Sequence, residues 1–286
     1  MIWVKDKKIN NMKYFLIFLI FVLGLPGNST AQSFTFQCNN ISIPVLEQND
    51  VPLSYGLNTY KYARITYSEK PLNVQVSVSG FNFSNKDWDI SPHSYGIKGT
   101  KKGDKLSFTI NRTGYLVVRF KKDFDFTKRL VIFVEPPEEF PDGELVDIVK
   151  KYKIDNTGNK NETEKIQQAL DEISGSGKVL YFPDGKYKTF SIRLKSNSRI
   201  HLAKNARIIA DASDIEPYMS EDPKGINRFI FIDNEQNISV TGLGTFDGNG
   251  SKILGVNNPE LVKKLDGMRL LFMVNSKNIS FDGILL

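Results

Sequence analysis

The polar residues best placed for chemistry lie in the glycine-rich segment from Gly244 to Gly250. Asp247 and Asn249 stand two residues apart there, where a carboxylate and an amide could contact a polar substrate. The same pair suits a structural role, because aspartate and asparagine side chains cap tight turns and glycines supply positive φ angles. We favour the structural role and keep both residues as weak substrate-contact candidates.

Two arginines form a second candidate site, since each begins one copy of a repeated block. Arg228–Leu243 and Arg269–Ile284 lie 41 residues apart and share seven of sixteen residues. A guanidinium group matches the geometry of a carboxylate, so Arg228 and Arg269 could bind an anionic sugar. A structural salt bridge at the start of a strand is the alternative that we favour. The repetition itself indicates a stacked-repeat architecture.

The remaining carboxylates and histidines give no catalytic motif. Asp233 and Asp282 occupy positions where the other copy of the block has a different residue, so we expect solvated turn residues. The sequence contains no Asp-Asp pair, and neither His93 nor His201 is flanked by glycines. The triplet Arg193-Leu194-Lys195 fits an Arg-x-Lys spacing only by coincidence. We therefore name no catalytic, cofactor-binding or metal-binding residue in this chain.

A group of aromatic residues in the first half of the chain permits a sugar-stacking platform. Aromatic residues at strand positions are more often part of a hydrophobic core, and we favour the core here. The five residues concerned are Tyr60, Tyr62, Tyr67, Trp88 and Tyr95.

Residues 1–31 have the pattern of a secretory signal peptide. Four lysines precede an apolar run from Tyr14 to Leu25, and the small-residue site Ser29-Thr30-Ala31 follows. We expect cleavage before Gln32 and a secreted or periplasmic protein; the alternative is an amino-terminal anchor that stays attached. The sequence has no second apolar run of about twenty residues, so we expect no membrane span in the mature protein.

Composition and charge limit the classes of molecule that we expect the protein to bind. Hydrophobic residues make up 40% and charged residues 24% of the chain, as in ordinary globular proteins. The net charge of +6 falls to +3 without the leader, which is too weak to indicate nucleic acid. An acidic polysaccharide is permitted. Cys38 is the single cysteine, so no intramolecular disulfide can form. We expect a monomer without a cofactor.

Two kinds of hydrophobic pattern divide the mature chain. Residues 32–136 alternate with period two, as at Val74, Val76 and Val78, and about seven short strands between Asn39 and Glu135 predict a β-sandwich. Residues 137–145 contain a proline-rich linker. The pattern of residues 146–286 is typical of a parallel β-helix that opens with one capping helix.

That helix should begin at Asn161 or Thr163 and end at Gly175-Ser176-Gly177, with four residues on one buried face: Ile166, Ala169, Leu170 and Ile173. We predict no other helix in the mature chain. The intervals from Ile200 to Ile238 and on to Ile279 are 38 and 41 residues. These intervals suggest two coils of about twenty residues each, which would place one coil between the repeated blocks. Asparagines would then form ladders at the turns, and Phe231 and Phe272 would stack in the core.

Five segments resemble, in order, the opening coils of pectin-lyase-like right-handed parallel β-helix proteins. They are Asp155–Gly158, Glu164–Asp171, Gly177–Tyr187, Leu194–Leu202 and Gly242–Gly250. Within that superfamily they are most similar to the polygalacturonases of glycoside hydrolase family 28. A sandwich ahead of the β-helix is similar to the layout of the dextranase family.

The resemblance implies an all-β exported glycosidase that hydrolyses a plant or algal polysaccharide with inversion. Such enzymes use a carboxylic acid and a carboxylate base roughly 6.5 to 9.5 Å apart. The family signatures Asn-x-Asp, Asp-Asp, Gly-His-Gly and Arg-x-Lys lie beyond the coils matched here, so we expect the catalytic residues C-terminal to Leu286 and this chain alone to be inactive. A polysaccharide lyase on the same scaffold and a non-catalytic glycan-binding or adhesin protein are the alternatives.

Overall fold

The computed structural model describes a large part of the chain, and the structural statements below concern that part. The predicted leader, residues 1–31, lies outside it. None of the helices described is both long and apolar enough to cross a membrane. The residues described are 34–49, 59–80, 83–84, 87–120, 129–214, 216–218, 227–253 and 269–286.

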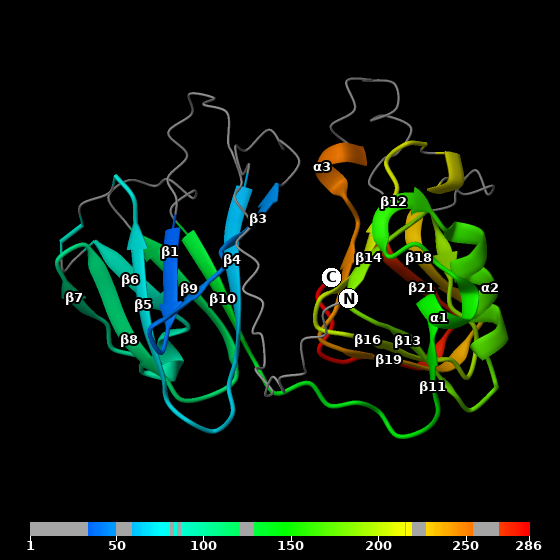
Figure 1. Ribbon diagram of the computed structural model, residues 1–286, viewed down its shortest axis with the longest axis horizontal. Helices are drawn as coiled ribbons and strands as arrows, with labels where there is room; N and C mark the ends of the chain where they lie inside the picture. The colour runs from blue at the N-terminus through cyan, green and yellow to red at the C-terminus, as the bar shows by residue number, and fades with distance from the viewer. Residues whose placement is uncertain are drawn as a thin grey trace, which may run out of the picture. The chain divides into compact units, whose positions relative to one another are not determined.

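The first part is a β-sandwich of two five-stranded sheets, at the left of Figure 1. Sheet A has the order β2-β1-β5-β8-β7 and sheet B the order β3-β4-β10-β9-β6. Neighbouring strands are antiparallel except β4 and β10, which are parallel. Sheet A contains β1 (Phe34–Cys38), β2 (Ile41–Ile43), β5 (Leu72–Val78), β7 (Thr100–Lys102) and β8 (Lys105–Ile110). Sheet B contains β3 (Leu46–Asn49), β4 (Thr59–Thr66), β6 (Trp88–Ser91), β9 (Gly114–Phe120) and β10 (Arg129–Glu135).

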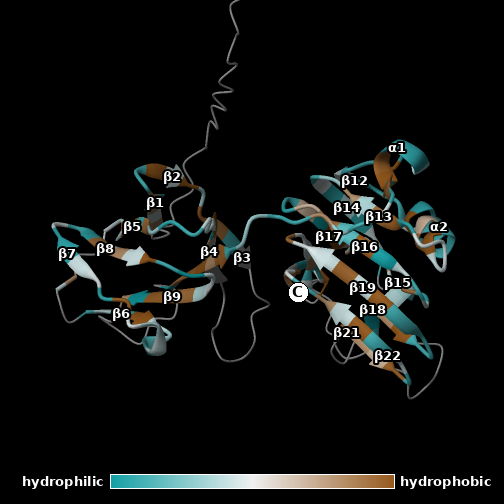
Figure 2. Cartoon of the chain, turned by 90° about the horizontal axis from the view of Figure 1, so that it is seen from below, coloured by the Kyte–Doolittle hydropathy of each residue, from teal (hydrophilic) through white to brown (hydrophobic). Residues whose placement is uncertain are grey.

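Period-two alternation explains the sandwich core. Val74, Val76 and Val78 of β5 point inward and are buried, whereas the residues between them face outward. Figure 2 shows β9 as hydrophobic along much of its length, because Leu116, Val117 and Val118 follow one another in this strand. The prediction of about seven strands from Asn39 was too low, because the alternation already begins at Phe34 and several strands have only three or four residues. Cys38 is free and buried, and burial raises the pKa of its thiol.

The second part is a β-helix of three parallel sheets, at the right of Figure 1. Sheet C contains β11 (Leu145–Asp147), β13 (Val179–Phe182), β16 (Arg199–Leu202), β19 (Gln236–Gly242) and β22 (Lys277–Phe281). Sheet D contains β12 (Thr157–Asn161), β14 (Gly185–Thr189), β17 (Ala206–Ala210) and β20 (Thr245–Asp247). Sheet E contains β15 (Ile192–Arg193), β18 (Arg228–Asp233) and β21 (Arg269–Val274).

Helix α2 (Thr163–Ile173) covers the first coil and packs against β13, β14 and β15. The four residues predicted for its inner face are all buried, and they join the core of the β-helix. The helix begins after Glu162, which makes no side-chain cap; the Oδ1 atom of Asn161 instead accepts hydrogen bonds from the backbone N and Oγ1 of Thr163. The prediction of a single helix was wrong. The structure adds α1 (Ile148–Tyr152), α3 (Gly250–Ile253) and the 3-10 turns η1 (His93–Tyr95) and η2 (Glu216–Tyr218).

The coils differ in length, and this corrects the predicted spacing. Leu180 pairs with Ile200, which is 20 residues later, whereas Ile200 pairs with Val240, which is 40 residues later. Val240 pairs directly with Phe281, so the two repeated blocks stack on each other with no coil between them. The strands stay short in every coil. Most of the additional residues fall between sheets D and E, in segments 211–227 and 248–268.

An asparagine ladder at the coil corners confirms the predicted role of Asn237 and Asn278, whereas the side chain of Asn234 donates to Asp233 instead. The Nδ2 atom of Asn278 donates to Oδ1 of Asn237 at 3.0 Å, and Nδ2 of Asn237 donates to Oδ1 of Asn197 at 3.1 Å. All three asparagines have φ between 55° and 58°. Gly242 is required for a different reason, because a Cβ atom there would lie 2.1 Å from the carbonyl oxygen of Leu202 in the coil below.

Arg64 of β4 joins sheet B to two successive coils of the β-helix. Its guanidinium donates to the backbone oxygens of Lys204 and Leu243, and its Nε lies 2.7 Å from Oε1 of Glu135. The ammonium group of Lys204 lies 3.1 Å from the other oxygen of Glu135 and donates to Thr66 at 2.8 Å. The cluster therefore ties the last strand of the sandwich to neighbouring turns of the β-helix.

Candidate functional site

Three arginines gather on sheet E because the strands stack in parallel register. Arg228 of β18 pairs with Arg269 of β21, and Arg193 of β15 pairs with Phe231 of β18. The pairing also places Phe231 on Phe272. We call these five residues the arginine face. Parallel stacking puts equivalent residues about 4.8 Å apart, so the side chains form one continuous surface.

One aromatic ring, that of Phe231, contacts two of the guanidinium groups. The Cζ atoms of Arg193 and Arg228 lie 4.7 Å and 3.9 Å from the centre of the Phe231 ring. The rings of Phe231 and Phe272 stack at 6.1 Å with an angle of 10°. Phe231 is only 8% exposed, yet it is not part of the main hydrophobic cluster that contains its neighbours Ile230 and Ile232. The predicted stack therefore exists, but it lies outside that cluster and under the arginines.

Arg193 is further positioned by helix α2. The side chain of Gln167 accepts a hydrogen bond from the backbone N of Arg193 at 2.9 Å and donates to its backbone O at 3.0 Å. The sequence identified Arg228 and Arg269 but missed Arg193, because its role depends on a partner strand 35 residues later. Arg269 is exposed at the next coil. The face can offer several guanidinium groups to carboxylates along one polymer chain.

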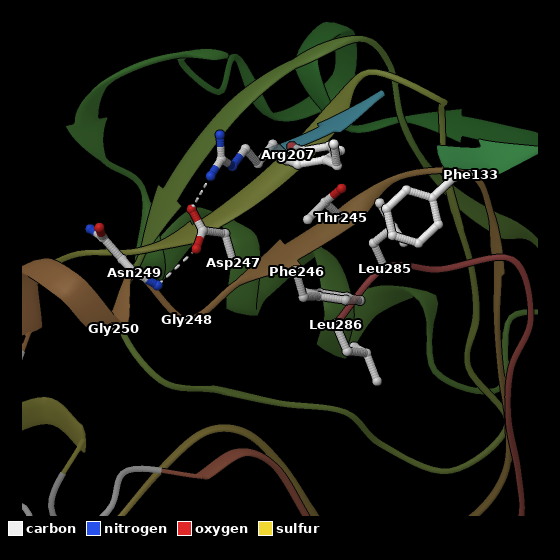
Figure 3. A pocket seen from close by; sticks show the side chains of 11 residues that line it. Phe133, Arg207, Thr245, Phe246, Asp247, Gly248, Asn249, Gly250, Leu285 and Leu286 are labelled. Atoms are coloured by element: carbon white, nitrogen blue, oxygen red, sulfur yellow. Dashed lines mark hydrogen bonds and ion pairs between the residues drawn. The ribbon is translucent and has the colours of Figure 1, made fainter. Parts of the chain in front are cut away.

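Asp247 and Asn249 lie in a cavity of about 260 Å³, shown in Figure 3. Asp247 is 9% exposed; its Oδ2 lies 2.6 Å from Nη2 of Arg207, and its Oδ1 accepts from the backbone N of Asn249 at 2.9 Å. Both carboxylate oxygens are engaged, so Asp247 holds the turn. The cavity is lined by Tyr62, Phe133, Arg207, Thr245, Phe246, Asp247, Gly248, Asn249, Gly250, Leu285 and Leu286.

The conformation of this turn corrects one detail of the prediction. The positive φ angle falls on Asn249, at 48°, and its Nδ2 donates to the backbone O of Ala210 at 2.9 Å. Gly244 is needed instead for close approach, because a Cβ atom there would lie 2.4 Å from Cβ of Leu202. The structural role that we favoured for Asp247 and Asn249 agrees with these contacts.

Other carboxylates near sheet E also have structural partners. Asp233 accepts a hydrogen bond from Nδ2 of Asn234 at 2.9 Å. Glu235 accepts bonds from both the backbone N and the hydroxyl of Ser196, one coil earlier. Asp282 is exposed, and its backbone N donates to Val240. In the part of the chain that the structure describes, no three His, Cys, Asp or Glu side chains are grouped so as to hold a metal ion.

A family model described as "Rhamnogalacturonase A/epimerase, pectate lyase-like" matches residues 148–253. The β-helix is of the pectin-lyase-like type. This match confirms the resemblance predicted from the sequence. The matched residues run from α1 to α3 and include Arg193 and Arg228 of the arginine face, together with Asp247 and Asn249.

Similar solved structures include a Parabacteroides merdae protein described as a glycosyl hydrolase, with 26% identity and a TM-score of 0.43 over 49% of this chain. Dex49A from Penicillium minioluteum has 16% identity and a TM-score of 0.47 over 78% of this chain. The family 28 exopolygalacturonase from Yersinia enterocolitica has 15% identity and a TM-score of 0.41 over 76%. The chain spans 63%, 46% and 52% of these proteins' lengths, respectively. No curated protein matches the chain in sequence.

The aromatic residues considered for sugar stacking do not form one platform. Tyr67, Trp88 and Tyr95 pack against the sandwich core, as the core interpretation predicts. Tyr62 instead lies on the outer side of sheet B, where its ring meets that of Phe133 edge-on at 6.0 Å. The side chain of Tyr60 lies outside the described residues.

His201 is a buried polar residue whose role the sequence did not reveal. It lies on sheet C of the pectin-lyase-like β-helix, with Nδ1 2.9 Å from the Thr241 hydroxyl and Nε2 3.3 Å from Oε1 of Glu138. The rings of Phe140 and Tyr181 lie 4.9 Å and 6.0 Å from its ring. Burial lowers the pKa of His201. The segment before β11 is thus fastened to sheet C by a histidine whose partners come from three separate segments.

Proposed function

We propose that this chain is part of an exported glycoside hydrolase that binds an acidic polysaccharide along the arginine face and hydrolyses its glycosidic bonds with inversion. The observation that carries the proposal is the presence of Arg193, Arg228 and Arg269 on consecutive coils of a pectin-lyase-like β-helix. Arg228 is in register with Arg269, and Arg193 is in register with Phe231, the ring that contacts both Arg193 and Arg228. Uronate carboxylates repeat along such a polymer, so a repeated guanidinium surface would fit them. The name of the matching family model, which includes a rhamnogalacturonase, supports a pectin-type substrate.

Rigid arginines favour specific recognition. Arg193 and Arg228 rest on the Phe231 ring, and Phe231 rests on Phe272, so two of the three guanidinium groups are positioned before a ligand arrives. Positioning before binding reduces the conformational entropy lost on association.

The hydrolytic step requires a carboxylic acid and a carboxylate base. Asp233, Glu235 and Asp247 already hold turns or neighbouring coils. The proposal therefore keeps the expectation, taken from the family resemblance, that the catalytic carboxylates lie C-terminal to Leu286. The 286-residue chain should bind the polymer without releasing reducing ends.

The decisive experiment measures binding of polygalacturonate to the chain by isothermal titration calorimetry. Arg228→Ala and Arg269→Ala should each weaken binding about tenfold, as expected for loss of a charge-assisted hydrogen bond. Arg228→Lys keeps the charge and loses the planar fork, so it should recover only part of the affinity. Lys160→Ala is the matched control, since Lys160 is exposed on β12, away from sheet E.

Neutral dextran bound as tightly as polygalacturonate would refute recognition of an acidic polymer. Unchanged affinity in both alanine variants would refute the arginine face as the binding site. Release of reducing ends by this chain alone would show that its own carboxylates suffice. An unsaturated product that absorbs ultraviolet light would favour the lyase alternative over the hydrolase.

The proposed export is tested separately. Amino-terminal sequencing of the exported protein should give a sequence that begins at Gln32.

A further inference from the structure

The outer face of sheet A carries a row of uncharged side chains that crosses all five strands. The strand register aligns Ser42 of β2 with Gln37 of β1, Gln37 with Gln75 of β5, and Gln75 with Ser107 of β8. Ser107 in turn aligns with Thr100 of β7. Residues opposite one another in a sheet share a face, so these five form one line of hydroxyl and amide groups. We call it the polar row.

The polar row retains its hydrogen-bonding capacity. Among the residues that the structure describes, none of its five side chains has a hydrogen-bonding partner, whereas other polar side chains on the same face do. Thr35 bonds to Ser77, and the Thr109 hydroxyl donates to Oδ1 of Asn73 at 3.2 Å. Strands lie about 4.8 Å apart, so the row extends about 19 Å across the sheet. That length suits an extended ligand better than a single small molecule.

Two neighbouring hollows follow the row and share Gln75. Their volumes are about 170 Å³ and 530 Å³. Tyr95 lines the larger hollow, and the guanidinium Cζ of Arg112 lies 4.1 Å from the centre of its ring. No aspartate or glutamate lines either hollow. Hydroxyl and amide groups in a shallow concave surface can exchange hydrogen bonds with the hydroxyls of sugar rings.

Lysines border the same face and give it a positive charge. Lys98 and Lys102 line the larger hollow, and Lys105 lines the smaller. Lys102 and Lys105 are aligned across β7 and β8, which places like charges opposite each other. None of the three has an ion-pair partner among the described residues, although Asp104 lies in the intervening turn. An anionic ligand would relieve this repulsion.

The opposite face of the sandwich is used differently. On sheet B, Tyr62 and Phe133 pack together and line the cavity beside β20, and Arg64 and Glu135 form the cluster with Lys204. These contacts join sheet B to the β-helix. Sheet A has no such contacts between the described residues of its polar row and the β-helix, so its outer face remains available to a ligand.

We propose that the outer face of sheet A binds a chain of an acidic polysaccharide. The polar row bonds to sugar hydroxyls, and Lys98, Lys102 and Lys105 pair with the carboxylates. The row provides length and direction, while the lysines provide selection for an anionic polymer. This site is separate from the arginine face and does not depend on the hydrolytic function proposed above.

The test is titration of the full chain with polygalacturonate in an Arg193→Ala/Arg228→Ala/Arg269→Ala background, so that sheet A is measured without any guanidinium group of the arginine face. Gln37→Ala/Gln75→Ala should weaken the residual binding about tenfold. Lys102→Ala/Lys105→Ala should weaken it by a similar factor and reduce its salt dependence. Lys160→Ala/Lys277→Ala makes the same charge change on exposed residues of the β-helix and should leave the affinity unchanged. Thermal unfolding shows that each variant is folded.

The possible outcomes distinguish binding at sheet A from binding at the arginine face. Residual binding that both sheet A variants weaken supports this proposal. Loss of all binding in the arginine background alone shows that sheet A does not bind, which overturns this proposal and supports the arginine face. Residual binding that is equal in all sheet A variants, or equally tight for neutral dextran, also overturns it.

Discussion

The β-helix and the sandwich build their outer faces in different ways. In the β-helix, parallel coils place like residues on like, as with Arg228 on Arg269 and Phe231 on Phe272. In the sandwich, the row across sheet A joins unlike residues from five strands, such as Gln75 and Ser107. A face made by stacking is therefore visible as a sequence repeat. A face made by antiparallel pairing has no such signature.

The two faces also differ in how firmly they hold their charges. Arg193 and Arg228 lie over an aromatic ring, so their positions depend on the coil stack. Lys102 and Lys105 stand opposite each other at the edge of sheet A without a described ion-pair partner. The first arrangement favours selective binding of carboxylates at defined points. The second favours adaptable attraction of an anionic chain.

The largest effect should come from a glycine at a coil contact. Gly242→Ala should lower the free energy of unfolding by about 4 kcal/mol, because the new Cβ would lie 2.1 Å from the Leu202 carbonyl oxygen, which is part of the backbone. Gly103→Ala is the matched change in a sandwich turn, where φ is +61° and no atom lies within 4 Å; it should cost about 1 kcal/mol. Urea unfolding measures both. Equal losses would show that coil stacking is no tighter than a hairpin turn.

The second-largest loss of stability should come from the cluster of Arg64, Glu135 and Lys204, which joins the sandwich to the β-helix. Arg64→Ala removes one of the two cationic partners of buried Glu135 and the donors to two coil carbonyls, so it should cost about 3 kcal/mol. Arg112→Ala removes an exposed arginine over Tyr95 and should cost about 0.5 kcal/mol. Thermal unfolding followed by circular dichroism compares them. A loss below 1 kcal/mol for Arg64→Ala would mean that the sandwich and the β-helix are stable without this cluster.

The asparagine ladder tests stacking at the surface. Asn237→Ala should cost about 2 kcal/mol, because it removes bonds to Asn197 and Asn278 and places alanine at φ +57°. Asn237→Gly loses the same bonds without the backbone penalty and should cost about 1 kcal/mol. The difference between the variants isolates the backbone term. If glycine proved as stable as asparagine, the ladder bonds would contribute nothing.

The smallest effect should be the pH dependence of stability that arises from His201, which contacts Glu138 of the segment before β11. Burial lowers the pKa of His201 below its ordinary value of 6.5, so the unfolded chain binds the proton more readily. The stability contribution is fully present above pH 6.5 and is lost as pH falls toward the folded-state pKa. Comparing unfolding midpoints across this range should show a weaker pH dependence in His201→Gln than in the parent chain.

The residues that surround His201 provide the control variant for this prediction. Glu138→Gln removes the one carboxylate among its described contacts and should steepen the loss at low pH, because Glu138 favours the protonated imidazole. Thr241, Phe140 and Tyr181 complete the surroundings and carry no charge in this range. A parent chain whose stability does not change between pH 7.5 and about pH 5 would contradict the prediction.

Much of the fold followed from the sequence. The repeated blocks predicted that equivalent residues such as Phe231 and Phe272 stack, although with a coil between them, whereas the structure pairs them directly. The helix at Thr163–Ile173 has the predicted buried face. The coil length was predicted wrongly. The hydrophobic pattern marks strands, but it does not distinguish an added coil from a longer connection between two strands.

The candidate sites were harder to predict from the sequence than the fold. Asp247, Asn249, Arg228 and Arg269 were found because they lie in a local motif or repeat. Arg193 and the polar row were missed. Their neighbours come from distant strands, and single glutamines or serines at alternating positions look like any solvent-facing strand. Only the register of five strands brings such residues into one line.

The growth of the coil from 20 to 40 residues affects how this fold can change over evolutionary time. The connection between sheets D and E grows from two residues, 190–191, to 17 residues, 211–227, which is about three doublings in length. Each doubling of a flexible connection costs about 0.6 kcal/mol of chain entropy, so the longer connection costs about 2 kcal/mol, and the three sheets keep their register. Most of the added residues enter between sheets D and E, and each long segment leads directly into Arg228 or Arg269. Insertions at this corner could therefore alter the surroundings of the arginine face while leaving the stacked strands unchanged.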